Sequence, residues 1–274
     1  VFKIGLPIES LKKESIINWK YVHALPTKNM QRGVQLSLTN EEIKKIHPAD
    51  LADILEDLDA NSRKIIFNEL DTSQAAETLS EVEHNIQLSL IKDEPDTEVA
   101  KILTEMEPDE AADILIDMEE DKAENIIENL EDRELKSEIK DLMEYEEDTA
   151  GGLMSSKVFE ITPDLNKLDV LNIIKNEFKE IESIYDIFVI SPEGSLIGYC
   201  PLNKILISDD QVQVGAIMEK EDIKYISPDS SWRDVAKTMS KYNLINIPVT
   251  EKGTNKLLGI ISVDDVLPWL LDEK

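Results

Sequence analysis

Short amphipathic segments follow one another through the middle of the chain. Leu51, Ile54, Leu55 and Leu58 recur at helical spacing, so they share one face, while acidic residues occupy the other. Pro48 stands where the first turn of a helix tolerates proline. This pattern predicts a train of helices of roughly a dozen residues each. They are expected over 48–58, 61–70, 72–82, 84–92, 96–106, 108–118, 121–130 and 132–143.

The helical region repeats itself. Residues 48–70 and 108–130 align without a gap at an offset of 60, and both contain proline followed by an Ala-Asp-Ile-Leu stretch. A weaker copy around Ala75 follows Leu51 by 24 residues. Helices that recur at such intervals are typical of an α-solenoid or a compact superhelical bundle. A capping-box pattern at 39–42 predicts where the helical region begins.

The pattern changes at both ends of this region. Strand character at 16–17, 19–25 and 34–38 predicts a short β-rich segment over 1–38. On the other side, two glycines in 148–154 predict a linker.

Two similar units with the order β-α-β-β-α then follow. Their helices are expected near 166–180 and 231–242, and Thr-Pro-Asp at 162–164 matches Ser-Pro-Asp at 227–229. Further strands are expected around 187–190, 196–199, 245–249 and within 257–265, with turns at 193–194 and 252–253.

The charge is concentrated in the helical region. The chain carries a net charge of −29, and residues 39–150 hold thirty-six acids against ten Lys or Arg residues. This balance excludes nucleic acid as a partner, because DNA and RNA binding needs basic surfaces. Dense like charge destabilises a compact state, so a basic partner or divalent cations are expected to relieve it, although an acidic solvated surface is the alternative.

The sequence shows no motif typical of an enzyme active site. No glycine-rich phosphate loop, nucleophile elbow or paired catalytic acid is evident, so the sequence predicts no enzyme. The single cysteine, Cys200, lies in an apolar run and is expected to be buried rather than reactive. With one cysteine no internal disulfide can form, which fits a reducing compartment.

The paired units resemble a tandem of CBS domains, because they occur twice in the right order and end in Gly-Ile-Ile-Ser-Val-Asp-Asp at 259–265. With the acidic helical repeat and the junction at 145–154, the chain resembles the cytosolic part of MgtE-family magnesium transporters. The implied fold class is α+β multidomain: an all-α superhelical repeat domain, then a tandem CBS pair, after a short β-rich N-terminal remnant. The implied boundaries are 1–38 (resembling part of a PRC barrel), 39–147, a linker at 148–154, and 155–274, with the CBS halves at about 155–210 and 211–274.

The resemblance implies a cytosolic Mg²⁺-sensing module that gates a pore by Mg²⁺-dependent domain closure. Family ligands fall on Glu77, Asp109 and Asp113 in the helical domain, where the alternative is a solvated helix face or a favourable charge at a helix N-terminus. In the second CBS half, the magnesium ligands that the resemblance implies are Asn243 and Asp265, and the neighbouring Asp234 and Asp264 could substitute at positions that lack a carboxylate. Arg233 and Pro268 depart from the family's acidic pattern, and Arg233 suggests a direct salt bridge in place of a metal.

The resemblance also implies an adenine nucleotide such as ATP, held at its phosphate and ribose by Ser262 and Asp265. Asp265 is open to either a metal or a ribose role, and both residues could instead cap the last helix. Pro201 and Lys204 occupy the matching positions of the first half and lack the motif.

The implied partners are a second copy of the chain through the CBS domains and a transmembrane domain of the same polypeptide. The implied location is the cytoplasmic face of the cell membrane. The alternative is a stand-alone CBS regulatory protein without a pore, which binds an adenine nucleotide or a partner protein.

Overall fold

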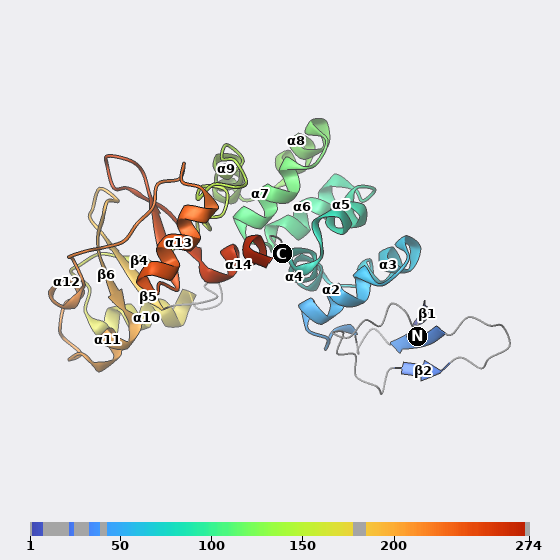
Figure 1. Ribbon diagram of the computed structural model, residues 1–274, viewed down its shortest axis with the longest axis horizontal. Coiled ribbons are helices and arrows are strands. Elements are labelled where there is room, and N and C mark those ends of the chain that lie inside the picture. The colour runs from blue at the N-terminus through green and yellow to red at the C-terminus, as the bar shows by residue number, and fades with distance from the viewer. Residues whose placement is uncertain (1, 8–21, 25–32, 39–42, 178–184, 272–274) are drawn as a thin grey trace. The chain divides into compact units, whose positions relative to one another are not determined.

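The computed structural model describes residues 2–7, 22–24, 33–38, 43–177 and 185–271 (Figure 1). The chain divides into two compact units, Val1–Lys136 and Ser137–Lys274. The predicted strand at 16–17 and the predicted capping box at 39–42 lie outside the described residues.

The N-terminal segment forms a three-stranded antiparallel sheet in the order β1-β3-β2. Its strands are β1 (Phe2–Pro7), β2 (Val22–Ala24) and β3 (Gly33–Leu38). The strand predicted at 34–38 is confirmed, and three residues of the one predicted at 19–25 are described as a strand. Strand β1 was not predicted, because its glycine and terminal proline are atypical of strand interiors.

Each helix predicted between residues 48 and 143 has a counterpart in the structure. The helices are α2 (Pro48–Glu56), α3 (Ala60–Phe67), α4 (Thr72–Glu81), α5 (His84–Ile91), α6 (Asp96–Thr104), α7 (Pro108–Ile116), α8 (Glu120–Asn129) and α9 (Arg133–Leu142). From Pro48 to Glu120 a new helix begins every twelve residues. The two repeat intervals in the sequence, 24 and 60 residues, are multiples of this spacing.

These helices pack as two rows. In one row α2 contacts α4, α4 contacts α6 and α6 contacts α8, and in the other α3 contacts α5 and α5 contacts α7 (Figure 1). The weaker repeat, in α4, therefore lies beside α2. The stronger repeat is in α7, which belongs to the other row. The strength of the sequence similarity between two helices therefore does not indicate whether they lie in the same row.

The apolar face predicted from the sequence is the core of the rows. Leu51, Ile54, Leu55 and Leu58 are all buried. Burial of such side chains stabilises each by about 1.5–3 kcal/mol relative to exposure. The helices themselves are too short to be stable alone, so packing between helices maintains them.

Residues 155–210, the first half of the paired units, follow the predicted element order. They contain β4 (Glu160–Ile161), α10 (Lys167–Glu177), β5 (Asp186–Ile190), β6 (Leu196–Pro201) and α11 (Leu202–Ile207). Strand β4 is parallel to β5, and β5 is antiparallel to β6. The predicted turn is present, with Gly194 at a φ of 82°, a conformation that glycine adopts without strain.

Residues 211–274, the second half, repeat that plan after α12 (Val214–Ile217). They contain α13 (Trp232–Tyr242), β7 (Asn246–Thr250), β8 (Leu257–Ser262) and α14 (Val263–Leu271). A parallel bridge between Ile226 and Val249 stands where the first half has β4. Both halves also carry the same irregularity, after Val189 and after Val249.

The two halves join through equivalent positions. Ser195 and Lys256 form an antiparallel bridge, and the Leu196 and Leu257 amides donate to carbonyls of the opposite turn at 2.8 and 3.1 Å. Buried Phe188, Leu196 and Leu257 form an apolar cluster between the halves. This pairing of like with like gives the region an approximate internal twofold relation.

Candidate functional site

The acidic candidates of the helical domain lie on α4 and α7. Glu77 is exposed on α4 and accepts a hydrogen bond from Ser73 Oγ at 3.3 Å. Asp109 and Asp113 lie one turn apart on α7 and are half-buried. The Ser80 hydroxyl, on the same side of α4 as Glu77, donates to Glu110 Oε2 at 2.6 Å, so this side of α4 faces the first turn of α7.

These carboxylates do not form a closed metal site. Within the described ranges, no three His, Cys, Asp or Glu side chains come together closely enough to hold a metal ion. Their chemistry nevertheless fits magnesium, which prefers oxygen ligands and keeps several of its waters when one or two carboxylates bind it. The assignment of magnesium to Glu77, Asp109 and Asp113 stays a prediction.

The motif at the start of α14 is closely hydrogen-bonded. The Ser262 amide donates to Asp265 Oδ2 at 2.7 Å. Ser262 Oγ lies 3.0 Å from Asp265 Oδ2 and 2.6 Å from Asp264 Oδ1. Since a hydroxyl donates only one hydrogen, it chooses between the two carboxylates. This is the arrangement of a helix cap, and it also places one hydroxyl and two carboxylates at the end of a strand where a ligand's hydroxyl or phosphate groups could bind.

Two further candidates of the second half have local structural roles. Asp234 is paired with Ser231 across the first turn of α13, because the Ser231 hydroxyl donates to Asp234 Oδ2 at 3.0 Å and accepts from the Asp234 amide at 3.3 Å. Asn243 ends α13 in the left-handed conformation, with φ 52° and ψ 46°. Asparagine tolerates that conformation better than most residues. A metal role would be additional to these roles.

Arg233 and Pro268, which depart from the family's acidic pattern, both have clear surroundings in the structure. The Arg233 guanidinium lies over the Trp232 ring, 4.4 Å from its centroid, and Trp232 packs against Trp269 at 5.7 Å. Pro268 lies inside α14, where it offers no backbone N–H. The salt bridge suggested for Arg233 stays a prediction.

The first half differs chemically from the second at the position of the motif. Lys204, the counterpart of Asp265, donates from Nζ to Glu219 Oε1 at 2.5 Å, and this bond raises the pKa of Lys204. Pro201, the counterpart of Ser262, has no hydroxyl. Nearby Cys200 is buried, and burial raises the pKa of its thiol to about 11, so it is a protonated thiol at neutral pH, as the sequence predicted.

The junction after the helical region is a packed segment, which the sequence did not reveal. The Ala150 amide donates to the Ser230 carbonyl at 2.7 Å, and the Trp232 amide donates to the Asp148 carbonyl at 3.0 Å. Gly151 is required because an added Cβ would lie 2.4 Å from the Tyr145 ring. The two glycines were the available signal, since glycine permits close approach as well as flexibility. This segment therefore braces the start of α13.

Comparison with known families identifies both regions. Residues 46–148 match the family model of the MgtE intracellular N domain, and residues 214–272 match that of the CBS domain. The first half, outside the matched range, has the same element order as the second. No helix in the described part of the chain is long and apolar enough to cross a bilayer.

Curated relatives share this similarity over much of the chain. The magnesium transporter MgtE of Thermus thermophilus is 30% identical over 243 residues, which cover 88% of this chain and 53% of that protein. MgtE of Enterococcus faecalis is 31% identical over 135 residues, 49% of this chain and 29% of that protein. The chain thus spans about half the length of these relatives or less.

Solved structures agree with the sequence comparison. The cytosolic domain of the Mg²⁺ channel MgtE in complex with ATP matches with a TM-score of 0.78 and 29% identity, over 84% of this chain and 93% of that one. The soluble part of a magnesium transporter matches with a TM-score of 0.77 and 25% identity, over 85% of this chain and 91% of that one. The predicted fold class, helical domain followed by CBS pair, is confirmed.

Proposed function

This chain has the cytosolic architecture of the MgtE family, an MgtE intracellular N domain followed by a CBS pair, and we propose that it is the Mg²⁺-sensing regulatory part of a magnesium transporter. The observation that carries the proposal is the match over 84% of this chain to the cytosolic domain of a Mg²⁺ channel, with both domains in the same order. The relatives are named as transporters, and we assign no catalytic role to this chain.

The proposed mechanism begins with repulsion. Residues 39–150 carry a net charge of −26, and the CBS pair is also acidic. Bound Mg²⁺ would supply positive charge, and the waters that it keeps would bridge to carboxylates. With the charge neutralised, the two domains close, and without it they separate. Closure and separation would be transmitted to a pore.

The chain's own residues would hold the ion from two sides. On the helical domain the proposed ligands are Glu77, Asp109 and Asp113. On the CBS pair they are Asp234, Asn243, Asp264 and Asp265. A site with one or two carboxylates from each side, at which the ion keeps several of its waters, suits a weak sensor.

The second CBS half would also bind one adenine nucleotide. The Ser262 hydroxyl and Asp265 carboxylate are the proposed contacts to its phosphate and ribose. The similar cytosolic domain of a Mg²⁺ channel was solved in complex with ATP, which supports this chemistry. At Asp265, nucleotide and metal would compete or share one carboxylate.

A homodimer through the CBS pair, at the cytoplasmic face of a membrane, completes the proposal, with the transmembrane domain on the same polypeptide. Apolar side chains on α11 and α14 support the dimer. On α11 Ile207 is 85% exposed, and on α14 Val263, Leu267, Leu270 and Leu271 are exposed at helical spacing, a row of apolar side chains that monomeric proteins seldom leave uncovered.

Small-angle X-ray scattering tests the proposed closure. We expect the radius of gyration of the chain to fall when millimolar Mg²⁺ is added to a chelator-treated sample. A KCl series at matched ionic strength is the control for general screening of charge.

A matched variant ties the effect to the proposed ligands. The triple variant Glu77→Gln, Asp109→Asn, Asp113→Asn removes three charges and keeps the side-chain shapes. Its control, Glu124→Gln, Glu128→Gln, Glu131→Gln, removes three charges from another part of the same domain. The proposal fails if Mg²⁺ compacts the unmodified chain no more than KCl does. It also fails if Mg²⁺ compacts the triple variant and its control equally.

A further inference from the structure

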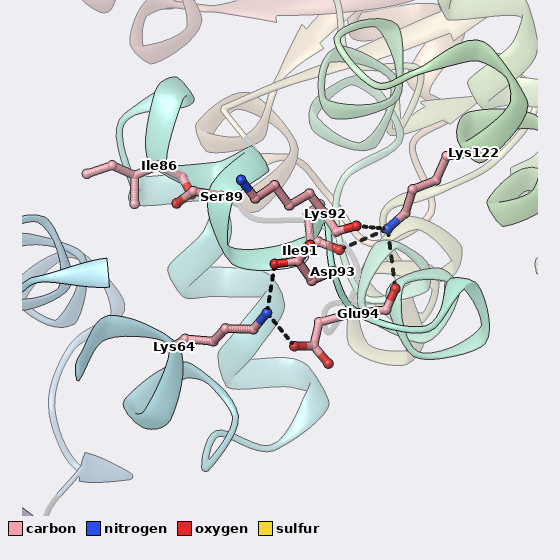
Figure 2. A network of polar contacts seen from close by, with 8 residues as sticks. All are labelled: Lys64, Ile86, Ser89, Ile91, Lys92, Asp93, Glu94 and Lys122. Carbon is pink, nitrogen blue, oxygen red and sulfur yellow. Dashed lines mark hydrogen bonds and ion pairs between the residues drawn. The ribbon is translucent and has the colours of Figure 1, made fainter. Parts of the chain in front are cut away.

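The turn between α5 and α6, residues 92–95, points several backbone carbonyls at one ammonium group. Lys122 Nζ, which comes from α8, lies 3.3 Å from the Ile91 carbonyl oxygen and 3.3 Å from that of Glu94. The Lys92 carbonyl oxygen accepts from the same ammonium. Figure 2 shows the three oxygens gathered around Lys122 Nζ, and we call them the carbonyl cage.

The cage follows from how α5 ends. The last carbonyls of a helix have no partner within it and carry partial negative charge. Here the Lys92 amide donates to the Leu88 carbonyl at 2.9 Å and the Glu94 amide to the Ile91 carbonyl at 3.1 Å, so the turn is fixed by its own backbone. Convergent carbonyl oxygens held in this way are ligands that hard cations accept.

A second lysine holds the same turn from the other side. Lys64, on α3, lies 3.2 Å from Asp93 Oδ2 and 3.5 Å from Glu94 Oε1. Glu94 therefore gives its carboxylate to Lys64 and its carbonyl to Lys122 (Figure 2). Because α3 and α8 belong to different rows, this turn ties the two rows together.

Charge alone does not decide the choice of partner. At the end of α2, Arg63 likewise donates to backbone carbonyls, those of Leu55, Glu56 and Leu58. Thirty-six acids surround ten Lys or Arg residues in 39–150, yet Lys122 contacts carbonyls. Lys92, in the same turn, contributes only its carbonyl to the cage, and its own side chain extends away from Lys122 (Figure 2). The ammonium of Lys122 is thus placed as an ion would be.

We propose that the carbonyl cage is a cation site of the helical domain which the chain fills with its own Lys122 ammonium. With Lys64, this tethered cation joins the two rows of helices without a metal ion. The inference does not depend on the proposed sensing function. It assigns to two lysines a share in holding the two rows of helices together, in addition to apolar packing and whatever Mg²⁺ does elsewhere.

The test compares Lys122→Ala with Lys92→Ala in the full chain. Both variants remove one positive charge at the α5–α6 turn, but only Lys122→Ala empties the cage. We expect Lys122→Ala to melt about 2–8 °C below the unmodified chain, as loss of a charged hydrogen-bond cluster does, and Lys92→Ala to change little.

Small cations then report on the empty cage. At equal ionic strength, potassium or ammonium chloride should restore part of the Lys122→Ala loss, whereas choline chloride, whose cation is too large, should not. The unmodified chain and Lys92→Ala should melt alike in all three salts. The proposal is overturned if Lys122→Ala melts like Lys92→Ala, or if choline restores it as well as potassium does.

Amide hydrogen exchange provides a local readout. Protection of the Lys92 and Glu94 amides should fall in Lys122→Ala and recover with potassium. Should Lys122→Ala not fold, Lys122→Met keeps the apolar stem without a donor or a charge and should show the same cation dependence. Equal exchange at these two amides in Lys122→Met and the unmodified chain would also overturn the proposal.

Discussion

Many side chains that look like ligands in the sequence already have a structural partner. Asp59 Oδ1 accepts from the Asn61 and Ser62 amides at 3.1 and 3.2 Å, and Asp71 Oδ1 accepts from the Gln74 amide at 3.2 Å. The hydrogen bonds from the Ser62 hydroxyl and from the Ser62 and Asn61 amides lower the pKa of Asp59. Part of the negative charge of the helical domain therefore serves to begin helices.

Ser262 and Asp265 present the same ambiguity between cap and ligand, and substitution separates the two roles. Ser262→Ala keeps the backbone bond from residue 262 to Asp265. It should therefore leave stability nearly unchanged while weakening ATP binding about 10- to 100-fold, the effect of losing a hydrogen bond to a charged group. Isothermal titration calorimetry measures this change.

Lys204→Ala is the matched control for that experiment. Lys204 occupies the first-half position equivalent to Asp265, so its loss should leave ATP affinity unaltered and binding at one site per chain. Unchanged ATP affinity in Ser262→Ala would mean that the motif only caps α14.

At the scale of elements, the helical domain is built from a unit that repeats every twelve residues. A helix of eight to ten residues and a short turn recur from α2 to α8. Successive helices alternate between the two rows, so each row repeats every 24 residues. In repeat architectures each unit depends on its neighbours for a buried face, and this accounts for the single apolar stripe on each helix.

The junction at 148–154 is an element in its own right, and Gly151→Ala probes it. The new methyl group would overlap the Tyr145 ring and should destabilise the chain by about 1–3 kcal/mol. Denaturant unfolding followed by tryptophan fluorescence suits this measurement, because the Trp232 amide donates to the Asp148 carbonyl of the junction.

A double-mutant cycle identifies the cause. If the clash with Tyr145 is responsible, Gly151→Ala should cost much less in a Tyr145→Ala background. An equal cost in both backgrounds would locate the effect in the backbone of residue 151 instead.

At the scale of the whole molecule, the division into two compact units predicts how the chain unfolds. Far-UV circular dichroism mainly follows the helical domain, whereas Trp232 and Trp269 report on the CBS pair. Without Mg²⁺ we expect the two thermal transitions to separate, because coincident transitions require cooperative coupling.

With Mg²⁺, the proposed closure should bring the two transitions together. Trp19→Phe removes the remaining tryptophan, so that fluorescence reports on one unit alone. Potassium chloride at the same ionic strength is the control. Transitions that coincide in chelator, or that stay separate at every Mg²⁺ concentration, would contradict coupling by the ion.

The sequence by itself determined the local elements. Each helix from α2 to α9 was predicted, because its apolar stripe, proline or acidic start and polar turn lie within a dozen or so residues of one another. The β-α-β-β-α order and the burial of Cys200 followed for the same reason. Strand β1 was missed because its partner, β3, lies some thirty residues away and its own composition is atypical.

Only the tertiary structure decided which distant residues meet. It placed the best-matching repeats, in α2 and α7, in different rows, and it brought Lys122 to the end of α5, thirty residues back in the sequence. It also turned the glycine-rich junction into a packed segment beside Ser230. Contacts of this kind depend on how apolar faces stack and on which side chains then reach the carbonyls at a helix end, and no local pattern records either.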